Sequence, residues 1–363
     1  MKKINIPIDQ NSYDVYLGHD IFDQLFKLVN KLRLNKNIML IVDKKLYDIR
    51  KHEIDILRKT YSGKLNILVI QATEKLKSFY TTQKIFTELL NNEYTRDTLL
   101  IAVGGGIIGD IVGFASSIFS RGVQYVQVPT TLLATVDSSV GGKTGINFEN
   151  TKNIIGAFNQ PKFVLIDSTL LTTLPKKEMI SGLGEVIKYA YLTDNNYYQF
   201  VLSNTDNIIG MKQDVLEKII EESVRFKGDV VANDEKETGT RKMLNLGHTF
   251  AHALEVEQNY KIKHGHAVIV GIACALYLSS RLNLIDDKKL ESLLRLILQV
   301  KDLVKISEVD YTQSISIMRR DKKNRNGKIK FVLLKDIGNI LLDVEASNRD
   351  IRFALKMGLS IFR

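Results

Sequence analysis

The sequence predicts an α/β protein in which a parallel-sheet domain, residues 1–168, precedes a mostly helical domain, residues 169–363. In the first half, short β-branched runs alternate with helical patterns, which is typical of stacked βαβ units. The expected strands are residues 37–43, 64–70, 98–103, 123–129 and 162–167. A 3.6-residue apolar period then predicts helices over 176–202, 211–230, 243–258, 265–282 and 286–300. Alternating residues around Gly338 predict a short hairpin over 328–343.

Length and composition indicate a globular chain with two cores. Of its 363 residues, 44% are hydrophobic and 25% are charged, and a single core stops growing near ~250–300 residues. No apolar run approaches the ~20 residues of a membrane-spanning helix. The basic N-terminus is not followed by an apolar stretch, so we expect a cytoplasmic location. Cys274 is the only cysteine, so the chain has no internal disulfide.

The net charge of +10 suits an anionic partner, which could be nucleic acid, a membrane surface or a small anionic molecule. The distribution of the charge along the chain helps to choose among these three. Cations are scattered among acids along the chain. The densest basic run, residues 319–330, lacks the interleaved aromatic residues of a surface that stacks bases. We therefore expect a small anionic molecule as the partner, and neither nucleic acid nor a membrane.

A glycine turn follows the expected strand 98–103. Gly104, Gly106 and Gly109 have the G-x-G-x-x-G spacing, which lets a backbone approach a pyrophosphate at a helix N-terminus. The match alone is weak, because the acid usually found about 20 residues later is missing. Asp43, at the end of an earlier strand, is a substitute for holding a ribose. A tight turn that only packs a helix on the sheet is the alternative.

Two further segments concentrate polar residues. Residues 128–161 combine glycines and hydroxyls with Asp137, Lys143 and Lys152, which is typical of a loop that wraps a phosphate or carboxylate ligand. Glu185 and Lys188 lie three apart on an expected helix with apolar neighbours. Their helix face is therefore expected to be buried, and a surface ion pair is the alternative.

Histidines form the third candidate group. His248 and His252 are four apart, and Asn245 would share their face if one helix covered all three. A metalloprotease H-E-x-x-H motif needs a glutamate at Thr249, so a proteolytic zinc site is disfavoured. Catalytic zinc commonly takes two histidines and a carboxylate. Glu185, His248 and His264 form such a set, although spacing alone leaves open His252 for His248 and His266 for His264.

Four long motifs resemble the 3-dehydroquinate synthase family. They are "VPTTLLATVDSSVGGKTGIN", "KNIIGAFNQP", "LPKKEMISGLGEVIKYA" and "LNLGHTFAHALE…HGHAV". The likeness runs in the same order and covers nearly the whole chain. The resemblance implies an N-terminal NAD-binding Rossmann-like domain, an α-helical metal-binding C-terminal domain and an active site in the cleft between them. It also implies a homodimer, NAD as cofactor, and zinc or cobalt as the metal.

The resemblance also assigns residues. It implies Glu185, His248 and His264 as metal ligands. It implies NAD contacts at Asp43, Glu74, Lys77, Gly105, Gly106, Ile107, Asp110, Thr130, Thr131, Lys143, Lys152, Thr173 and Glu178. Substrate-binding or catalytic residues are implied at His252, Asp137, Lys143, Lys188, Lys227, Arg241, Asn245, Arg121 and Asn153, and at one of Lys322 and Lys323. The chain departs from the family pattern at Thr135, Gly184, Ala251 and His266, none of which is an implied ligand.

The implied reaction converts 3-deoxy-D-arabino-heptulosonate 7-phosphate into 3-dehydroquinate and phosphate. It is a lyase reaction of the shikimate pathway, which leads to aromatic amino acids. NAD⁺ oxidises the substrate, phosphate leaves by β-elimination, the hydride returns and an intramolecular aldol reaction closes the ring. The alternatives are a polyol dehydrogenase of the glycerol dehydrogenase type and another sugar-phosphate cyclase. A noncatalytic anion binder would not need all three of Glu185, His248 and His264.

Overall fold

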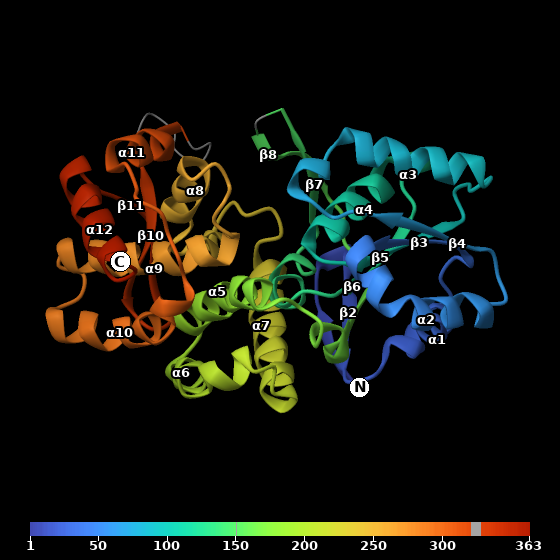
Figure 1. Cartoon of the computed structure of the whole chain (residues 1–363), viewed down its shortest axis with the longest axis horizontal. Coiled ribbons are helices and arrows are strands. Elements are labelled where there is room, and N and C mark those ends of the chain that lie inside the picture. The colour runs from blue at the N-terminus through green and yellow to red at the C-terminus, as the bar shows by residue number, and fades with distance from the viewer. Residues whose placement is uncertain (150, 321–327) are drawn as a thin grey trace. The chain divides into compact units, whose positions relative to one another are not determined.

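The computed structural model describes residues 1–149, 151–320 and 328–363. Contacts divide the chain into two compact units (Figure 1). The sheet unit consists of Met1–Leu174 and Leu216–Lys236, and the helical unit consists of Pro175–Val215 and Glu237–Arg363. The expected single boundary at 168/169 differs from this division, because residues 216–236 lie with the sheet unit although they follow the first helices of the helical unit.

In the described residues, the main sheet of the sheet unit has seven strands in the order β1-β2-β9-β6-β5-β3-β4. Its pairs are parallel except for β1 with β2. All five expected strands are present, as β3 (Asn37–Asp43), β4 (Leu65–Ile70), β5 (Thr98–Gly104), β6 (Gln124–Pro129) and β9 (Phe163–Asp167). Two N-terminal strands were not expected, β1 (Lys2–Ile6) and β2 (Tyr13–Gly18).

Helices cover both faces of this sheet, with α1 and α2 on one side and α3 and α4 on the other (Figure 1). These helices are α1 (Leu25–Lys31), α2 (Lys44–Thr60), α3 (Phe79–Asn91) and α4 (Gly106–Ile118). Successive residues of a strand point to opposite faces, so Leu40 packs in the core with α1 and α2, whereas Met39 and Ile41 pack with α3 and α4. Burial of both faces explains why β3 and β5 are continuous apolar runs.

The segment 128–161 is not the open loop expected from its composition. A single π-helical turn, η5 (Ala134–Ser138), is followed by an antiparallel hairpin of β7 (Lys143–Phe148) and β8 (Thr151–Phe158). Gly145 pairs with Gly156 in the hairpin. A Cβ on Gly156 would lie 2.2 Å from the carbonyl oxygen of Thr144, so the close pairing requires glycine there. Gly145 and Gly156, two of the glycines that suggested a loop, thus serve strand pairing.

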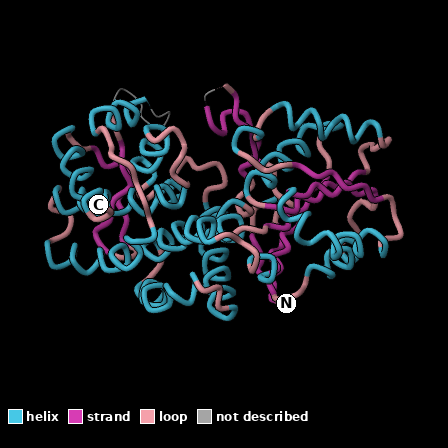
Figure 2. The backbone as a smooth tube through the Cα atoms, in the orientation of Figure 1, coloured by secondary structure: helices cyan, strands magenta, loops and turns pink. Residues whose placement is uncertain are grey.

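The helical unit is built mainly of helices, as the tube in Figure 2 shows. They are α5 (Lys176–Leu192), α6 (Asn195–Ile209), α8 (His248–Glu257), α9 (His264–Arg281), α10 (Asp287–Val300), α11 (Tyr311–Arg320) and α12 (Asn348–Ser360). The expected helix 176–202 is two helices, because Asp194 caps α6 by accepting a hydrogen bond from the Tyr197 amide. The hairpin of β10 (Lys330–Asp336) and β11 (Asn339–Glu345) is confirmed, with Gly338 at φ 72° in its turn.

Helix α7 (Gln213–Asn233) matches the expected helix 211–230, but most of it belongs to the sheet unit. The expected helix 243–258 begins later, at His248. Residues Thr240–Asn245 form a separate 3-10 helix, η7. Gly247, at φ 75°, interrupts the helical conformation between η7 and α8. A Cβ on Gly247 would lie 2.7 Å from the Ile272 nitrogen, so α8 and α9 also approach closely there. The prediction that Asn245 shares one helix face with His248 and His252 was therefore wrong.

In the described part of the chain, no helix has the length and apolar content that crossing a membrane requires.

Candidate functional site

The carboxyl ends of β3, β5 and β6 gather several expected cofactor residues at one edge of the sheet. Asp43 ends β3, Gly104 ends β5 and Thr130 follows β6, and the Thr130 amide donates to the Gly104 carbonyl at 3.0 Å. Burial raises the pKa of the Asp43 carboxyl, although the Ala72 amide opposes this by donating to it at 3.3 Å. This edge is where parallel α/β sheets bind their ligands.

The glycine turn leaves no room for side chains between the sheet and α4. Gly105 is the N-cap of α4, and a Cβ on it would lie 3.0 Å from the Thr131 methyl carbon. A Cβ on Gly106 would lie 2.8 Å from the Ser138 hydroxyl oxygen. Ile107, the next residue of α4, packs partly buried against the sheet core. The turn therefore exposes main-chain amides at a helix N-terminus, the arrangement that binds phosphate.

A buried cation lies beside this turn. Lys77 follows the short helix η3 (Glu74–Leu76), and its ammonium lies 2.5 Å from the carboxylate of Asp110 on α4. The same ammonium donates to the side-chain oxygen of Asn153 on β8, and Glu74 accepts from the Asn147 amide. Burial raises the pKa of Asp110, and Lys77 opposes the rise. Four expected contacts thus form one connected group.

A second ion pair in the sheet unit joins two expected substrate residues. The Lys227 ammonium on α7 lies 2.8 Å from the Asp137 carboxylate on η5 and donates to the Asp137 carbonyl at 2.6 Å. Lys227 is 6% exposed. This ion pair links α7 to the π-helical turn η5, which is consistent with the place of this part of α7 in the sheet unit.

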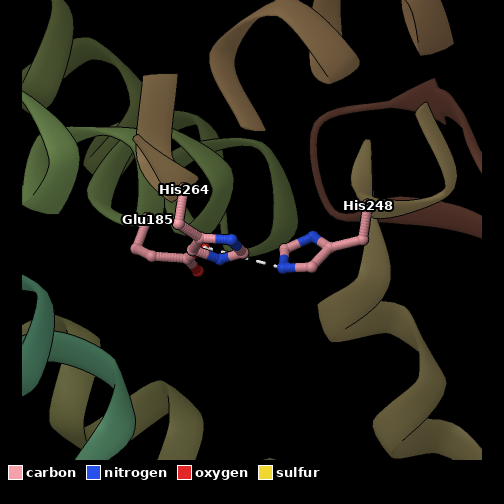
Figure 3. A group of neighbouring side chains, drawn as sticks. All are labelled: Glu185, His248 and His264. Carbon is pink, nitrogen blue, oxygen red and sulfur yellow. Dashed lines mark ion pairs between the residues drawn. The ribbon is translucent and has the colours of Figure 1, made fainter. Parts of the chain in front are cut away.

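In the helical unit, Glu185, His248 and His264 point toward one another from α5, α8 and α9 (Figure 3). One ligand atom of each lies within 4.8 Å of the other two. The Glu185 Oε1 atom lies 3.2 Å from His264 Nε2 and 3.7 Å from His248 Nε2. Ligand atoms about 2.1 Å from a tetrahedral zinc ion are separated by about 3.4 Å. The donor set and its spacing therefore fit a divalent zinc-like ion.

Close packing of α5 on α9 brings the carboxylate and the histidine together. A Cβ on Gly184 would lie 2.2 Å from the Gly265 carbonyl oxygen, and one on Gly265 would lie 1.7 Å from the Ser181 carbonyl oxygen. Each glycine directly precedes or follows a member of the group, namely Glu185 and His264. Glycine at 184, a departure from the family pattern, is thus required by this helix crossing.

Other charged side chains surround the three. Lys188, 2% exposed, forms an ion pair with Glu185, and Glu255 Oε2 lies 3.5 Å from His264 Nδ1. Burial disfavours the charged form of His264, but Glu185 and Glu255 outweigh it and raise the pKa of His264 to about 10. His252 lies beside the group, its ring centroid 5.3 Å from that of His248.

The sequence left open which histidine of the pairs His248/His252 and His264/His266 faces Glu185, and the structure distinguishes His264 from His266. His266 points elsewhere, with Nε2 3.3 Å from the carbonyl oxygen of Lys177. Its pKa is lowered, chiefly by burial. His264, not His266, faces Glu185, as does His248.

The remaining expected residues are spread over both units. Arg241 is 2% exposed on η7, Asn245 donates to Glu237 Oε1 at 2.6 Å, and Glu178 pairs with Lys263 at 2.6 Å. Lys143 is exposed at the far end of the hairpin, opposite Phe158. Lys152 is half-buried, and Thr173 is exposed. Lys322 and Lys323 lie outside the described residues.

Arg121 is the exception among the expected contacts in the sheet unit. It ends the short helix η4 (Phe119–Arg121), which precedes β6, so it lies at the amino-end edge of the sheet. Most of the other expected contacts in this unit lie at or after the carboxyl ends of parallel strands, and Lys227 on α7 pairs with one of them, Asp137. Sequence reasoning also missed Glu237 and Glu255. Glu255 is two helical turns after His248, a spacing that places both on one face, and this signal was present in the sequence.

Solved structures of other proteins share this fold. A 2-deoxy-scyllo-inosose synthase complexed with carbaglucose-6-phosphate, NAD⁺ and Co²⁺ is similar at a TM-score of 0.88 and 24% identity, over 98% of this chain and 99% of that one. A 2-epi-5-epi-valiolone synthase from Streptomyces hygroscopicus subsp. jinggangensis 5008, with NAD⁺ and Zn²⁺ bound, gives 0.86 and 22% over 97% and 98%. A probable glycerol dehydrogenase from Sinorhizobium meliloti 1021 gives 0.62 and 16% over 96% of each chain. The fold is that of the sugar-phosphate cyclases.

Sequence comparisons then give the family. The model for the 3-dehydroquinate synthase N-terminal part matches residues 67–181, and that for the C-terminal part matches residues 182–324. A 3-dehydroquinate synthase of Dictyoglomus thermophilum is 38% identical over 99% of both chains, and one of Shewanella frigidimarina is 39% identical over 93% of this chain and 94% of its own. The chain belongs to the 3-dehydroquinate synthase family, as its motifs predicted.

Proposed function

We propose that the chain converts 3-deoxy-D-arabino-heptulosonate 7-phosphate into 3-dehydroquinate and phosphate, the activity that names its relatives. The observation that carries the proposal is the buried group of Glu185, His248 and His264 with Lys188 beside it. A two-histidine, one-carboxylate set leaves a coordination position open for a substrate. Lys188 supplies a cation to the same small volume, which suits a phosphorylated carboxylate.

The sheet unit binds NAD in this account. The glycine turn offers amides to the cofactor pyrophosphate, and Asp43 at the end of β3 accepts from the adenosine ribose. Lys77 and Lys152 add positive charge near the phosphates. NAD⁺ held by these residues would supply the acceptor for a hydride from the substrate and, as NADH, the donor that returns it. The structural relatives named above that contain NAD⁺ share this fold at 22–24% identity.

The helical unit holds the metal through Glu185, His248 and His264. A bound divalent ion, zinc or cobalt, polarises hydroxyl oxygens and lowers their pKa. Lys188 and Arg241 bind the anionic groups of the substrate, for which the planar guanidinium of Arg241 suits bidentate capture of a carboxylate. His252, beside His248, accepts the proton that leaves the reacting hydroxyl. In the sheet unit, Asp137 helps to relay that proton and pairs with Lys227, and Lys227, Lys143 and Asn153 complete the substrate contacts.

The chain acts as a cytoplasmic homodimer. The position of Arg121 is the structural observation that supports a dimer. Its place at the amino-end edge of the sheet separates it from the contacts that follow the strands' carboxyl ends. Exposed apolar side chains lie in the same region, with Ile118 at 47% and Phe158 at 49%. Phe158 and Gly122 line one small pocket there. A second copy that covers this surface would receive Arg121 in its own site.

Mixing two inactive variants tests the shared site. Arg121→Ala and Lys188→Ala are each expected to be inactive alone, and subunit exchange is expected to restore phosphate release, because a mixed dimer has one site with both residues intact. A monomer in sedimentation at micromolar concentration, or no recovery after proven exchange, would contradict the proposal.

Substrate choice tests the activity itself. The metal-loaded chain with NAD⁺ is expected to release phosphate from 3-deoxy-D-arabino-heptulosonate 7-phosphate, and not from glucose 6-phosphate or sedoheptulose 7-phosphate, which have no carboxylate for Arg241 and Lys188. Faster release from either of the latter two would assign a different cyclase activity.

A further inference from the structure

The Glu255 side chain is a buried carboxylate to which the proposed reaction gives no role. It lies on α8, seven residues after His248, and is 5% exposed. Burying a carboxylate costs several kcal/mol unless charges or hydrogen bonds compensate. A carboxylate held at this depth therefore needs close partners, and the imidazole of His264 is one of them.

The His264 ring lies between two carboxylates. Its Nε2 atom faces Glu185 Oε1 at 3.2 Å, and its Nδ1 atom faces Glu255 Oε2 at 3.5 Å. His264 is the first residue of α9, with Lys263 as the N-cap. Its main chain is therefore held by the helix that follows it and not by a helix before it. Its side chain, 31% exposed, is the most exposed of the three side chains in the group. The ring orientation therefore depends on what holds Nδ1.

His248 has a corresponding partner of a different kind. Its Nδ1 atom lies 3.2 Å from the carbonyl oxygen of Leu246, two residues earlier. Both histidines thus present Nε2 to Glu185 and have an oxygen acceptor at Nδ1. For His248 the acceptor is main chain and cannot be removed by substitution, whereas for His264 it is the side chain of Glu255.

We propose that Glu255 is a positioning residue that orients His264 as a metal ligand, by accepting a hydrogen bond from Nδ1–H and leaving Nε2 free to bind the ion. Carboxylates in this position fix the tautomer and the ring, raise the basicity of the ligand and contribute 10–100-fold to metal affinity. Glu255 also adds a second negative charge beside His264. The inference rests on the proposed metal site and extends it by one residue.

Zinc affinity of the full chain tests this role without recourse to turnover. Metal-free protein is titrated with Zn²⁺ in competition with a chromogenic chelator. Glu255→Gln is expected to weaken Zn²⁺ binding about 10–100-fold, and Glu185→Gln, which removes a proposed ligand, more. Glu291→Gln on α10, an exposed carboxylate, is the matched control and is expected to bind as the parent does.

A double-substitution cycle separates positioning from a general structural role. If Glu255 acts through the His264 imidazole, Glu255→Gln has no further effect on Zn²⁺ affinity once His264→Asn is present. An equal loss in both backgrounds would overturn the proposal, as would parent-like affinity of Glu255→Gln. If the amide variant does not fold, Glu255→Asp retains the charge at a shorter reach, and a several-fold loss is then expected. Parent-like affinity of the aspartate would contradict positioning.

The parent chain distinguishes this inference from the proposed function. A parent that binds no Zn²⁺ would overturn both. A parent that binds Zn²⁺ and releases phosphate, with Glu255→Gln unchanged in affinity, would overturn the role of Glu255 alone.

Discussion

Lys188 and Glu185 form an ion pair between residues three apart on α5, and neither is more than 2% exposed. The same carboxylate faces both histidines through its other oxygen, Oε1. Lys188 therefore neutralises the carboxylate on one side while the histidines approach from the other. A buried charge that loses its partner is destabilising.

Substitution of Lys188 is expected to affect stability and catalysis together. Lys188→Ala removes the cation at Glu185 Oε2 and leaves the protonated His264 imidazole beside that carboxylate, so the metal-free chain should lose up to about 3–5 kcal/mol of unfolding free energy. Zn²⁺ is expected to restore part of this loss by replacing the missing charge, while kcat stays lower by orders of magnitude. Denaturant unfolding with and without Zn²⁺ measures the first effect. Lys212→Ala, at an exposed ion pair, is the control. Equal stability of the parent and Lys188→Ala without metal would contradict the account.

The raised pKa of His264 makes metal binding depend on pH. In the metal-free chain His264 holds its proton up to a pKa of about 10, whereas a metal ligand must be neutral. Zn²⁺ binding at pH 7–9 is therefore expected to release one proton from His264, and the apparent affinity to rise about tenfold per pH unit until pH approaches 10. Calorimetry in buffers of different ionisation enthalpy counts the protons. No release at pH 8 would show that this histidine is already neutral.

The same pKa has a consequence for stability without metal. A group whose pKa is higher in the folded chain stabilises it fully below the unfolded value, about 6.5 for histidine. The contribution of His264 is then lost as pH rises through about 10. Metal-free His264→Asn should therefore lose less stability between pH 8 and pH 10 than the parent. Identical pH profiles would contradict the two-carboxylate environment of His264.

The glycine contact between α5 and α9 should tolerate no added methyl group. A Cβ at Gly265 would lie 1.7 Å from the Ser181 carbonyl oxygen, so Gly265→Ala must push the two helices apart. Overpacking of this kind typically costs about 1–3 kcal/mol, and because Glu185 and His264 flank the contact, Zn²⁺ affinity should fall as well. Gly210→Ala, whose nearest contact would be 3.1 Å, is the control. Parent-like melting and Zn²⁺ binding of Gly265→Ala would refute this packing.

A substitution in the glycine turn should act on the other ligand. In Gly105→Ala the added Cβ would lie 3.0 Å from the Thr131 methyl carbon and occupy the approach to the α4 amides. NAD⁺ affinity is expected to fall at least tenfold, while Zn²⁺ affinity, which depends on residues of the helical unit, stays unchanged. Calorimetric titration with each ligand separates the two. Loss of both, or of neither, would argue against separate binding by the two units.

The sequence was most informative where periodicity was strong. All five expected strands and the β10–β11 hairpin are confirmed, because buried parallel strands have continuous β-branched runs and Gly338 marks its turn. It was less informative where tertiary contacts decide local structure. Gly247 adopts a left-handed conformation against α9 and ends the apparent helix before His248, and no local pattern distinguishes that glycine from one inside a helix.

The candidate site shows the same division. The set of Glu185, His248 and His264 was proposed from residue types and is assembled in space, but its choice over His252 and His266 at the sequence level depended on the family resemblance. Glu255 was overlooked because a carboxylate in an apolar helix has an ambiguous pattern. Its approach to His264 depends on how α8 packs on α9. This packing cannot be read from the sequence of either helix alone.

Simultaneous measurement of phosphate and NADH tests the proposed function most directly. The chain is mixed with NAD⁺, Zn²⁺ and 3-deoxy-D-arabino-heptulosonate 7-phosphate, and phosphate release and absorbance at about 340 nm, where NADH absorbs, are followed in one cuvette. We expect stoichiometric phosphate with no lasting absorbance, because the hydride returns to the substrate in each turnover. NADH that accumulates without phosphate would instead make the chain a dehydrogenase and contradict the account.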